Sequence, residues 1–136
     1  MSPLAALSQP STLIVAIVED QAAIAELLHD VLEDAGYAPV IISSSMTAVS
    51  EIAESGAQIV LLDIMMPRKN GWEVLDELRA EPATRDLPVV LTSAVYDRIG
   101  RRPLPFGGPI RFASKPLDVT ELIDTIEGFR TRQPTG

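Results

Sequence analysis

The chain has 136 residues, a length that suits one domain with a single core, and 46% of them are hydrophobic against 22% charged. A net charge of −8 disfavours non-specific electrostatic binding to the phosphate backbone of nucleic acids, so we expect no direct nucleic acid binding. The absence of cysteine excludes disulfides, thiolate zinc sites and cysteine nucleophiles. The apolar stretches are too short for a bilayer span, and the opening residues carry no base to begin a signal peptide, so we expect no membrane insertion and a cytoplasmic location.

The charges are segregated along the chain. The first 67 residues contain nine acidic residues and no basic one, whereas the remainder contains ten acidic and eleven basic residues. The amino-terminal half therefore presents an acidic face, which is either a solvated surface or a site for a cation or a basic partner.

Apolar runs alternate with amphipathic stretches along the chain. Residues 13–18 (LIVAIV) are uninterrupted and rich in β-branched side chains, the pattern of a strand covered on both faces. Apolar residues then recur at helical spacing, ending at Gly36. The further predicted strands are 40–42, 58–62, 88–93 and 110–113, and the predicted helices are 24–35, 46–53, 72–80 and 119–129, the last capped by Asp118.

This alternation predicts an α/β fold with a doubly wound, five-stranded parallel sheet of order 2-1-3-4-5, as in flavodoxin-like proteins. We expect a tail over residues 1–12, one domain over 13–130 and a second tail over 131–136. Between the fourth and fifth strands the segment VYDRIGRRPLPFGGPIR contains three prolines and three glycines. The fourth helix should therefore be shortened or replaced by a Pro/Gly-rich loop, whose arginines form either a solvated surface or a docking surface for an acidic partner.

Polar residues follow the strands at the sheet edge where such folds bind ligands. Glu19 and Asp20 follow the first strand, Asp63 the third, Ser93 ends the fourth and Lys115 follows the fifth. Three carboxylates at one edge repel each other, and a hard cation with oxygen ligands, Mg²⁺, would relieve this repulsion. The formal charges of the three carboxylates, one Mg²⁺ and Lys115 sum to zero. The pocket could therefore receive a phosphoryl group on a nucleophilic aspartate.

The sequence resembles the receiver domains of two-component response regulators over about residues 13–130. The resemblance rests on VED at 18–20, LLDIMMPRKNG at 61–71, LTSA at 91–94 and KP at 115–116. The intervals from Asp63 to Ser93 and from Ser93 to Lys115 are also those expected of the family.

The resemblance implies a role for each of these residues. Asp63 is the expected phosphoacceptor, and Ser93 and Lys115 are the expected phosphoryl ligands. Small Ala94 leaves room for the phosphoryl group. The expected Mg²⁺ ligands are Glu19, Asp20, Asp63 and the backbone carbonyl of Met65, and the expected switch residues are Ser93 and Phe112, although Phe112 could equally be an ordinary core aromatic.

The implied function is that of a stand-alone receiver. It would accept phosphate from a histidine kinase or histidine phosphotransfer protein and signal to an unknown downstream protein target, as a monomer or weak dimer. Its only catalysis would be self-phosphorylation and slow autodephosphorylation, so we expect no enzyme acting on a separate substrate. The alternative is a receiver-fold binding module that signals without phosphate. A phosphatase of the haloacid dehalogenase type is disfavoured, because its motif needs a second acid where Met65 stands.

Overall fold

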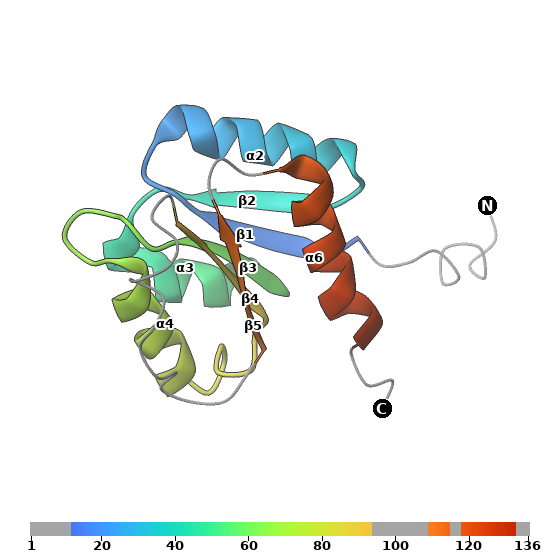
Figure 1. Cartoon of the computed structure of the whole chain (residues 1–136). Helices are drawn as coiled ribbons and strands as arrows, with labels where there is room; N and C mark the ends of the chain where they lie inside the picture. The colour runs from blue at the N-terminus through green and yellow to red at the C-terminus, as the bar shows by residue number, and fades with distance from the viewer. Residues whose placement is uncertain (1–11, 94–108, 115–117, 133–136) are drawn as a thin grey trace.

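The computed structural model describes residues 12–93, 109–114 and 118–132. The elements are β1 (Ile14–Val18), α2 (Ala22–Asp34), β2 (Ala38–Ile42), the 3₁₀ turn η1 (Ser45–Thr47), α3 (Ala48–Ser55), β3 (Ile59–Asp63), α4 (Gly71–Ala80), β4 (Val89–Ser93), β5 (Ile110–Ser114) and α6 (Val119–Arg132). The five strands are parallel and lie in the order β2-β1-β3-β4-β5, which confirms the predicted fold. Helices α2 and α6 cover one face of the sheet, and α3 and α4 cover the other (Figure 1).

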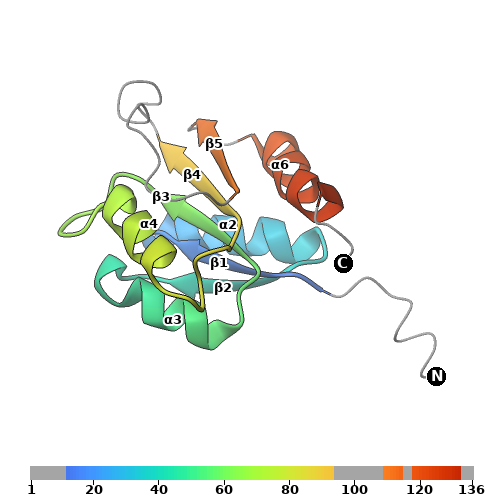
Figure 2. The ribbon, with the colours of Figure 1, turned by 90° about the horizontal axis from the view of Figure 1, so that it is seen from below.

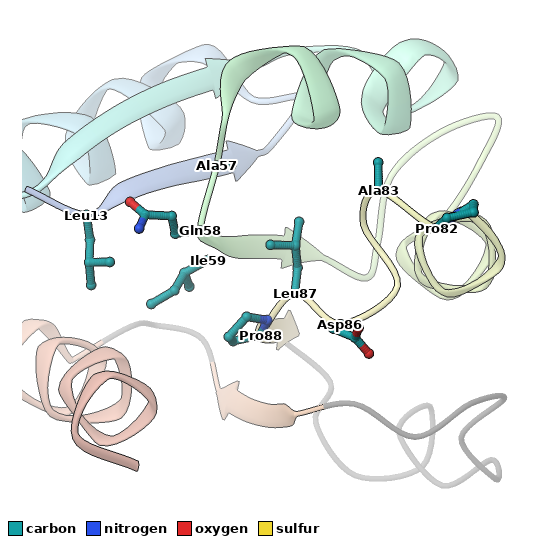
Figure 3. A pocket seen from close by; sticks show the side chains of 9 residues that line it. All are labelled: Leu13, Ala57, Gln58, Ile59, Pro82, Ala83, Asp86, Leu87 and Pro88. Carbon is teal, nitrogen blue, oxygen red and sulfur yellow. The ribbon is translucent and has the colours of Figure 1, made fainter. Parts of the chain in front are cut away.

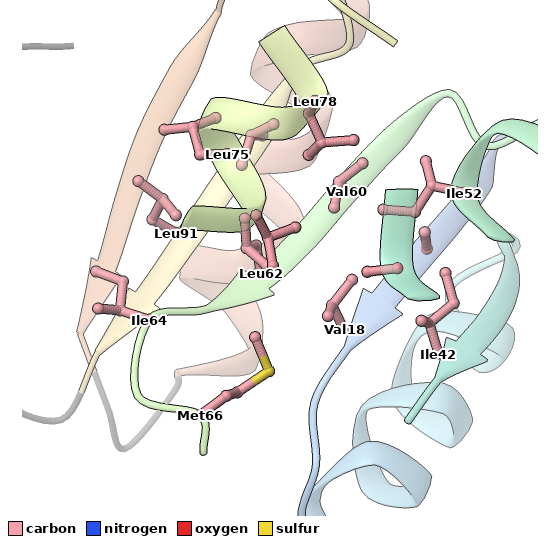
Figure 4. Close-up of a cluster of buried hydrophobic side chains, with 14 of the residues drawn as sticks. Val18, Ile42, Ile52, Val60, Leu62, Ile64, Met66, Leu75, Leu78 and Leu91 are labelled. Carbon is pink, nitrogen blue, oxygen red and sulfur yellow. The ribbon is translucent and has the colours of Figure 1, made fainter. Parts of the chain in front are cut away.

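Two apolar cores lie on either side of this sheet, because successive side chains of a strand point to opposite faces. In β3, Val60 and Leu62 belong to the core under α3 and α4 (Figure 4), whereas Ile59 and Leu61 belong to the core under α2 and α6. All five residues of β3 and of β4 are buried. Their uninterrupted apolar sequences therefore reflect burial on both faces, as predicted.

Three side chains predicted for the apolar faces of helices are exposed instead. Leu27 is 62% exposed, because the neighbouring Leu28 takes the position that faces the core. Met46 lies in η1, before α3 begins, and Val119 is the first residue of α6. Both are about half exposed, since neither position lies over the sheet in a regular helical turn.

The second strand is longer than predicted. It begins at Ala38 and contains Pro39, which lies in an edge strand that pairs only with β1. A proline is tolerated there because an edge strand leaves one row of backbone groups without a ladder partner. At the other end of the chain, Asp118 caps α6 as predicted, since its Oδ1 accepts a hydrogen bond from the Glu121 N–H at 3.0 Å.

A buried arginine ties α4 to the start of β5. Arg79 is 3% exposed, and its Nη1 donates hydrogen bonds to the carbonyl oxygens of Arg85 and Leu87 at 2.9 and 2.8 Å. Its Nη2 donates to the carbonyl oxygen of Pro109 at 3.2 Å. Burial lowers the pKa of Arg79, and the carboxylate of Asp86 acts in the opposite direction. The guanidinium thus ties α4 to the loop that leads into β4 and to the residue before β5.

Two further expectations from the sequence concern the segment between β4 and β5 and membrane insertion. The replacement of the fourth helix by a Pro/Gly-rich loop falls on residues 94–108, outside the described residues. Among the residues that are described, no helix combines the length and hydropathy needed to cross a membrane.

Candidate functional site

The parallel sheet brings the carboxyl ends of its strands to one edge (Figure 2). Asp63, the last residue of β3, is paired with Thr92 of β4, so Ser93 lies one residue further along the neighbouring strand. On the other side of β3, the register with β1 brings Glu19 beside Asp63. Residues that are far apart in the sequence therefore meet at this edge because of strand order and register.

Three carboxylates gather at this edge. One oxygen from each of Glu19, Asp20 and Asp63 lies within 4.8 Å of the other two. Glu19 and Asp63 are only 2% and 4% exposed, whereas Asp20 is open to solvent. At an effective dielectric near 20, like charges about 5 Å apart repel by about 3 kcal/mol. The cluster consists of oxygen donors alone, two of them shielded from water, so it fits a hard divalent cation such as Mg²⁺.

Main-chain hydrogen bonds orient two of these carboxylates. The Gln21 N–H donates to Oε2 of Glu19 at 3.2 Å, and the Met65 N–H donates to Oδ1 of Asp63 at 3.2 Å. The backbone of Met65 therefore lies at the site while its side chain is 55% exposed. That arrangement favours a main-chain role for Met65, although its carbonyl as a metal ligand stays a prediction.

Gly71 gives the loop after β3 its close approach to Asp63. A Cβ atom at Gly71 would lie 2.5 Å from the carbonyl oxygen of Asp63 and 2.7 Å from Cα of Ile64. The Gly71 N–H also donates to the carbonyl oxygen of Ile64 at 2.9 Å. Only glycine fits here without backbone movement, which gives a physical reason for the glycine eight positions after Asp63.

The loop between β3 and α4 is held by local hydrogen bonds. Arg68 has a positive φ of 69°, and the Lys69 N–H donates to the carbonyl oxygen of Pro67 at 2.7 Å, which closes a three-residue turn. Asn70 then caps α4 in a capping box with Glu73. This cap was not predicted from the sequence, although Asn followed three residues later by Glu is its signature.

Phe112 lies beside the site on the face of the sheet that α4 covers. Its ring centroid is 6.1 Å from that of Trp72, the second residue of α4, and the rings are tilted by 54°. The Phe112 side chain is 52% exposed, so it is not the ordinary core aromatic of the alternative interpretation. Its role as a switch stays a prediction.

Two expected site residues fall outside the described residues. Lys115 comes directly after Ser114, the residue of β5 that pairs with Ser93, and Ala94 comes directly after β4. Their proposed contacts with a phosphoryl group therefore rest on the sequence alone.

A second group of possible ligands lies on α2, where one atom each of His29, Asp30 and Glu33 lies within 4.8 Å of the others. Asp30 and Glu33 are exposed and His29 is partly exposed. Exposed acids on a helix are common without any ligand, so we assign this group no function.

Comparison with known proteins gives the same fold and the same class. Phosphate regulon transcriptional regulatory protein PhoB of Escherichia coli (strain K12) is 34% identical over 117 residues, 85% of this chain and 51% of that protein. The chain thus spans about half the length of PhoB. Polar-differentiation response regulator DivK of Brucella ovis is 30% identical over 115 residues, 85% of this chain and 94% of that protein.

Solved structures agree with this comparison. The signal receiver domain of a signal transduction histidine kinase from Syntrophus aciditrophicus superposes with a TM-score of 0.78 at 25% identity, covering 90% of this chain and 93% of that one. The receiver domain of sensor histidine kinase PA1611 from Pseudomonas aeruginosa PAO1, solved with magnesium in its active site cleft, has a TM-score of 0.76 at 20% identity, covering 87% and 97%. The family profile described as response regulator receiver domain matches residues 15–127, and the chain therefore belongs to the response regulator receiver domain family.

Proposed function

We propose that Asp63 accepts a phosphoryl group from a histidine kinase or a histidine phosphotransfer protein in a Mg²⁺-dependent reaction, and that the phosphorylated domain signals through contacts with another protein. The observation that carries the proposal is the grouping of Glu19, Asp20 and Asp63, with their oxygens within 4.8 Å, at the carboxyl edge of the sheet. Receiver domains are signalling domains, and the reaction proposed here modifies the domain itself rather than a separate substrate.

Asp63 is suited to act as the nucleophile. Asp63 is 4% exposed, and the Met65 N–H donates to one of its carboxylate oxygens at 3.2 Å, so that oxygen is held in place. In the transfer, the phosphorus–nitrogen bond of the phosphohistidine breaks as a bond forms between phosphorus and a carboxylate oxygen of Asp63. The electron pair of the broken bond stays on the histidine nitrogen, and the product is an acyl phosphate.

The charge of the arriving group requires compensation. A phosphoryl group brings further negative charge to a site that already holds three carboxylates. Glu19, Asp20, Asp63 and the Met65 carbonyl would hold the metal ion, which when bound supplies positive charge for the phosphoryl oxygens. We assign the remaining oxygens to the Ser93 hydroxyl and the Lys115 ammonium.

Signalling would follow from the contacts of the phosphoryl group. Ser93 is 4% exposed at the end of β4, and its movement toward a phosphoryl oxygen would open space beside β5. Phe112 of β5 lies outward, against Trp72, and could turn into that space. The surface that a partner meets would then differ between the two states.

The test is phosphorylation by a small donor. The purified protein is incubated with acetyl phosphate or phosphoramidate and Mg²⁺ and examined by intact mass and on Phos-tag gels. We expect one added phosphoryl group on the wild type and on Asp34→Asn, a matched loss of an exposed carboxylate on α2, and none on Asp63→Asn or with a chelator. An unmodified wild type, or equal labelling of Asp63→Asn, would refute the proposal.

The alternative function, a binding module that signals without phosphate, is not favoured. Such a module would not need the carboxylate cluster, yet Glu19, Asp20 and Asp63 are all present and close together. Beryllofluoride, a phosphoryl mimic, separates the two functions. A change in the affinity for a partner protein on its addition supports the phosphorylation switch, and an unchanged affinity contradicts it.

A further inference from the structure

A groove lies between α3 and α4, away from the carboxyl ends of the strands. It has a volume of about 560 Å³, which is within the range of sites that hold ligands or short peptide segments. Its apolar lining comes from small side chains, chiefly Val49 and Ala53 of α3 with Ala80 and Ala83 at the end of α4 and just beyond it. Because alanine does not protrude, a longer apolar side chain from another molecule can reach the floor.

The edges of this groove are acidic. Glu54 of α3 lines one side, and Glu77 of α4 with Glu81, its C-cap residue, lines the other. Glu81 has an extended backbone just past the last helical residue, Ala80, and both it and Glu77 are exposed. Glu77 is paired with Lys69 at 2.6 Å, but none of the described basic residues forms an ion pair with Glu54 or Glu81.

The amino-terminal edge of the sheet lies next to the groove. A second hollow of about 360 Å³ lies there between the residues that lead into β1, β3 and β4 (Figure 3). Ala83 lines both hollows, so the two adjoin at that residue. The second hollow adds Leu13, Ile59 and Leu87 to the apolar lining and Asp86 to the acidic groups.

We propose that the α3–α4 groove is a docking site for a short, basic amphipathic helix of a partner protein. A helix suits a groove between two helices, where its apolar residues at positions i and i+4 reach the alanines of the floor. Lysine or arginine residues on both flanks of that helix then meet Glu54 on one side and, on the other, Glu81 next to the Lys69-paired Glu77. A nucleic acid or an anionic membrane is excluded as the occupant by the sign of the charge.

This site is independent of phosphoryl transfer. The groove lies beside α3, α4 and the amino-terminal strand edge, whereas Asp63 lies at the carboxyl edge of the same sheet. The two proposals therefore fail separately, and Asp63→Asn should bind the same helix as the wild type.

The test begins with a random peptide library selected on the purified protein. We expect the enriched peptides to carry lysine or arginine around apolar residues at helical spacing. Amide shifts on titration with a synthetic enriched peptide should cluster on α3, α4 and residues 81–87. No enrichment, enriched peptides without basic residues, or shifts confined to another face would overturn the proposal.

Matched variants separate the groove from the net charge of the protein. The triple variant Glu54→Gln/Glu77→Gln/Glu81→Gln should weaken binding of the same peptide by about tenfold. The control Glu26→Gln/Glu33→Gln/Asp34→Asn removes the same charge from exposed positions of α2 and should leave the affinity unchanged. Ala80→Leu, which fills the groove at an exposed helix position, should also weaken binding. An equal loss in the α2 control would attribute the binding to net charge alone and contradict the docking site.

Discussion

Replacing Gly71 by alanine should disturb the backbone that carries Asp63. The added Cβ would lie 2.5 Å from the Asp63 carbonyl oxygen and 2.7 Å from Cα of Ile64, and neither atom can turn away as a side chain could. Forcing an extra carbon into a packed site costs about 1–3 kcal/mol, while alanine is favoured over glycine in a helix by up to about 1 kcal/mol. We therefore expect a net loss of about 1–2 kcal/mol in the free energy of unfolding.

Urea denaturation followed by circular dichroism measures this loss, with the m value as a check that the unfolded state is unchanged. Gly128→Ala in α6 is the matched control, because its added Cβ meets no atom within 4 Å apart from its chain neighbours and its own helical backbone, and it should stabilise the protein by up to about 1 kcal/mol. Phosphorylation of Gly71→Ala by acetyl phosphate should also slow, since the backbone of Asp63 must move. Equal stability of Gly71→Ala and Gly128→Ala, together with phosphorylation of Gly71→Ala at the wild-type rate, would contradict the close approach inferred for Gly71.

Arg79→Met keeps the apolar stem but removes hydrogen bonds to three backbone carbonyl oxygens. It should therefore lower the free energy of unfolding, measured by urea denaturation, by about 2–4 kcal/mol. A denaturation midpoint equal to that of the wild type would contradict the anchoring role of Arg79. Asp63→Asn removes one of three crowded carboxylates, so in metal-free buffer it should raise the free energy of unfolding by about 1–2 kcal/mol. The variant should also lose most of the further stabilisation that Mg²⁺ gives the wild type. A variant that is less stable than the wild type in metal-free buffer would contradict mutual repulsion of the carboxylates. Phe112→Ala should lower the free energy of unfolding by no more than about 1 kcal/mol, because the ring is half exposed. Because the ring contacts Trp72, the single tryptophan, the substitution should suppress the change in Trp72 fluorescence on addition of beryllofluoride. An unchanged fluorescence response would show that Phe112 takes no part in the switch.

The fold could be predicted from the sequence because the signals for it are local and repeated. Strands such as 59–63 are apolar at every position before the terminal Asp63, which indicates burial on both faces, and the amphipathic stretches between them require helices on both sides of the sheet. The predicted burial was wrong at the beginnings of helices, where Met46 and Val119 continue the apolar spacing without lying over the sheet. Spacing alone does not say where a helix begins.

The carboxylate cluster could also be predicted, because parallel strands place their carboxyl ends at one edge whatever the side chains. Contacts that depend on tertiary structure were not predictable in this way. Arg79 occupies a buried position of α4, and its charge argues for the surface until its three carbonyl partners are known. The outward position of Phe112 depends on the neighbouring ring of Trp72, which belongs to another element.

The central claim is that Glu19, Asp20 and Asp63 hold a divalent ion beside an aspartate that takes up a phosphoryl group. A crystal structure of the protein with Mg²⁺ and beryllofluoride tests it most directly. We predict one metal ion bound by these carboxylates and the Met65 carbonyl, with beryllofluoride on Asp63 contacting the Ser93 hydroxyl and the Lys115 ammonium. Crystals soaked at saturating concentrations that show neither ligand at Asp63, or that show Lys115 directed away from it, would contradict the account.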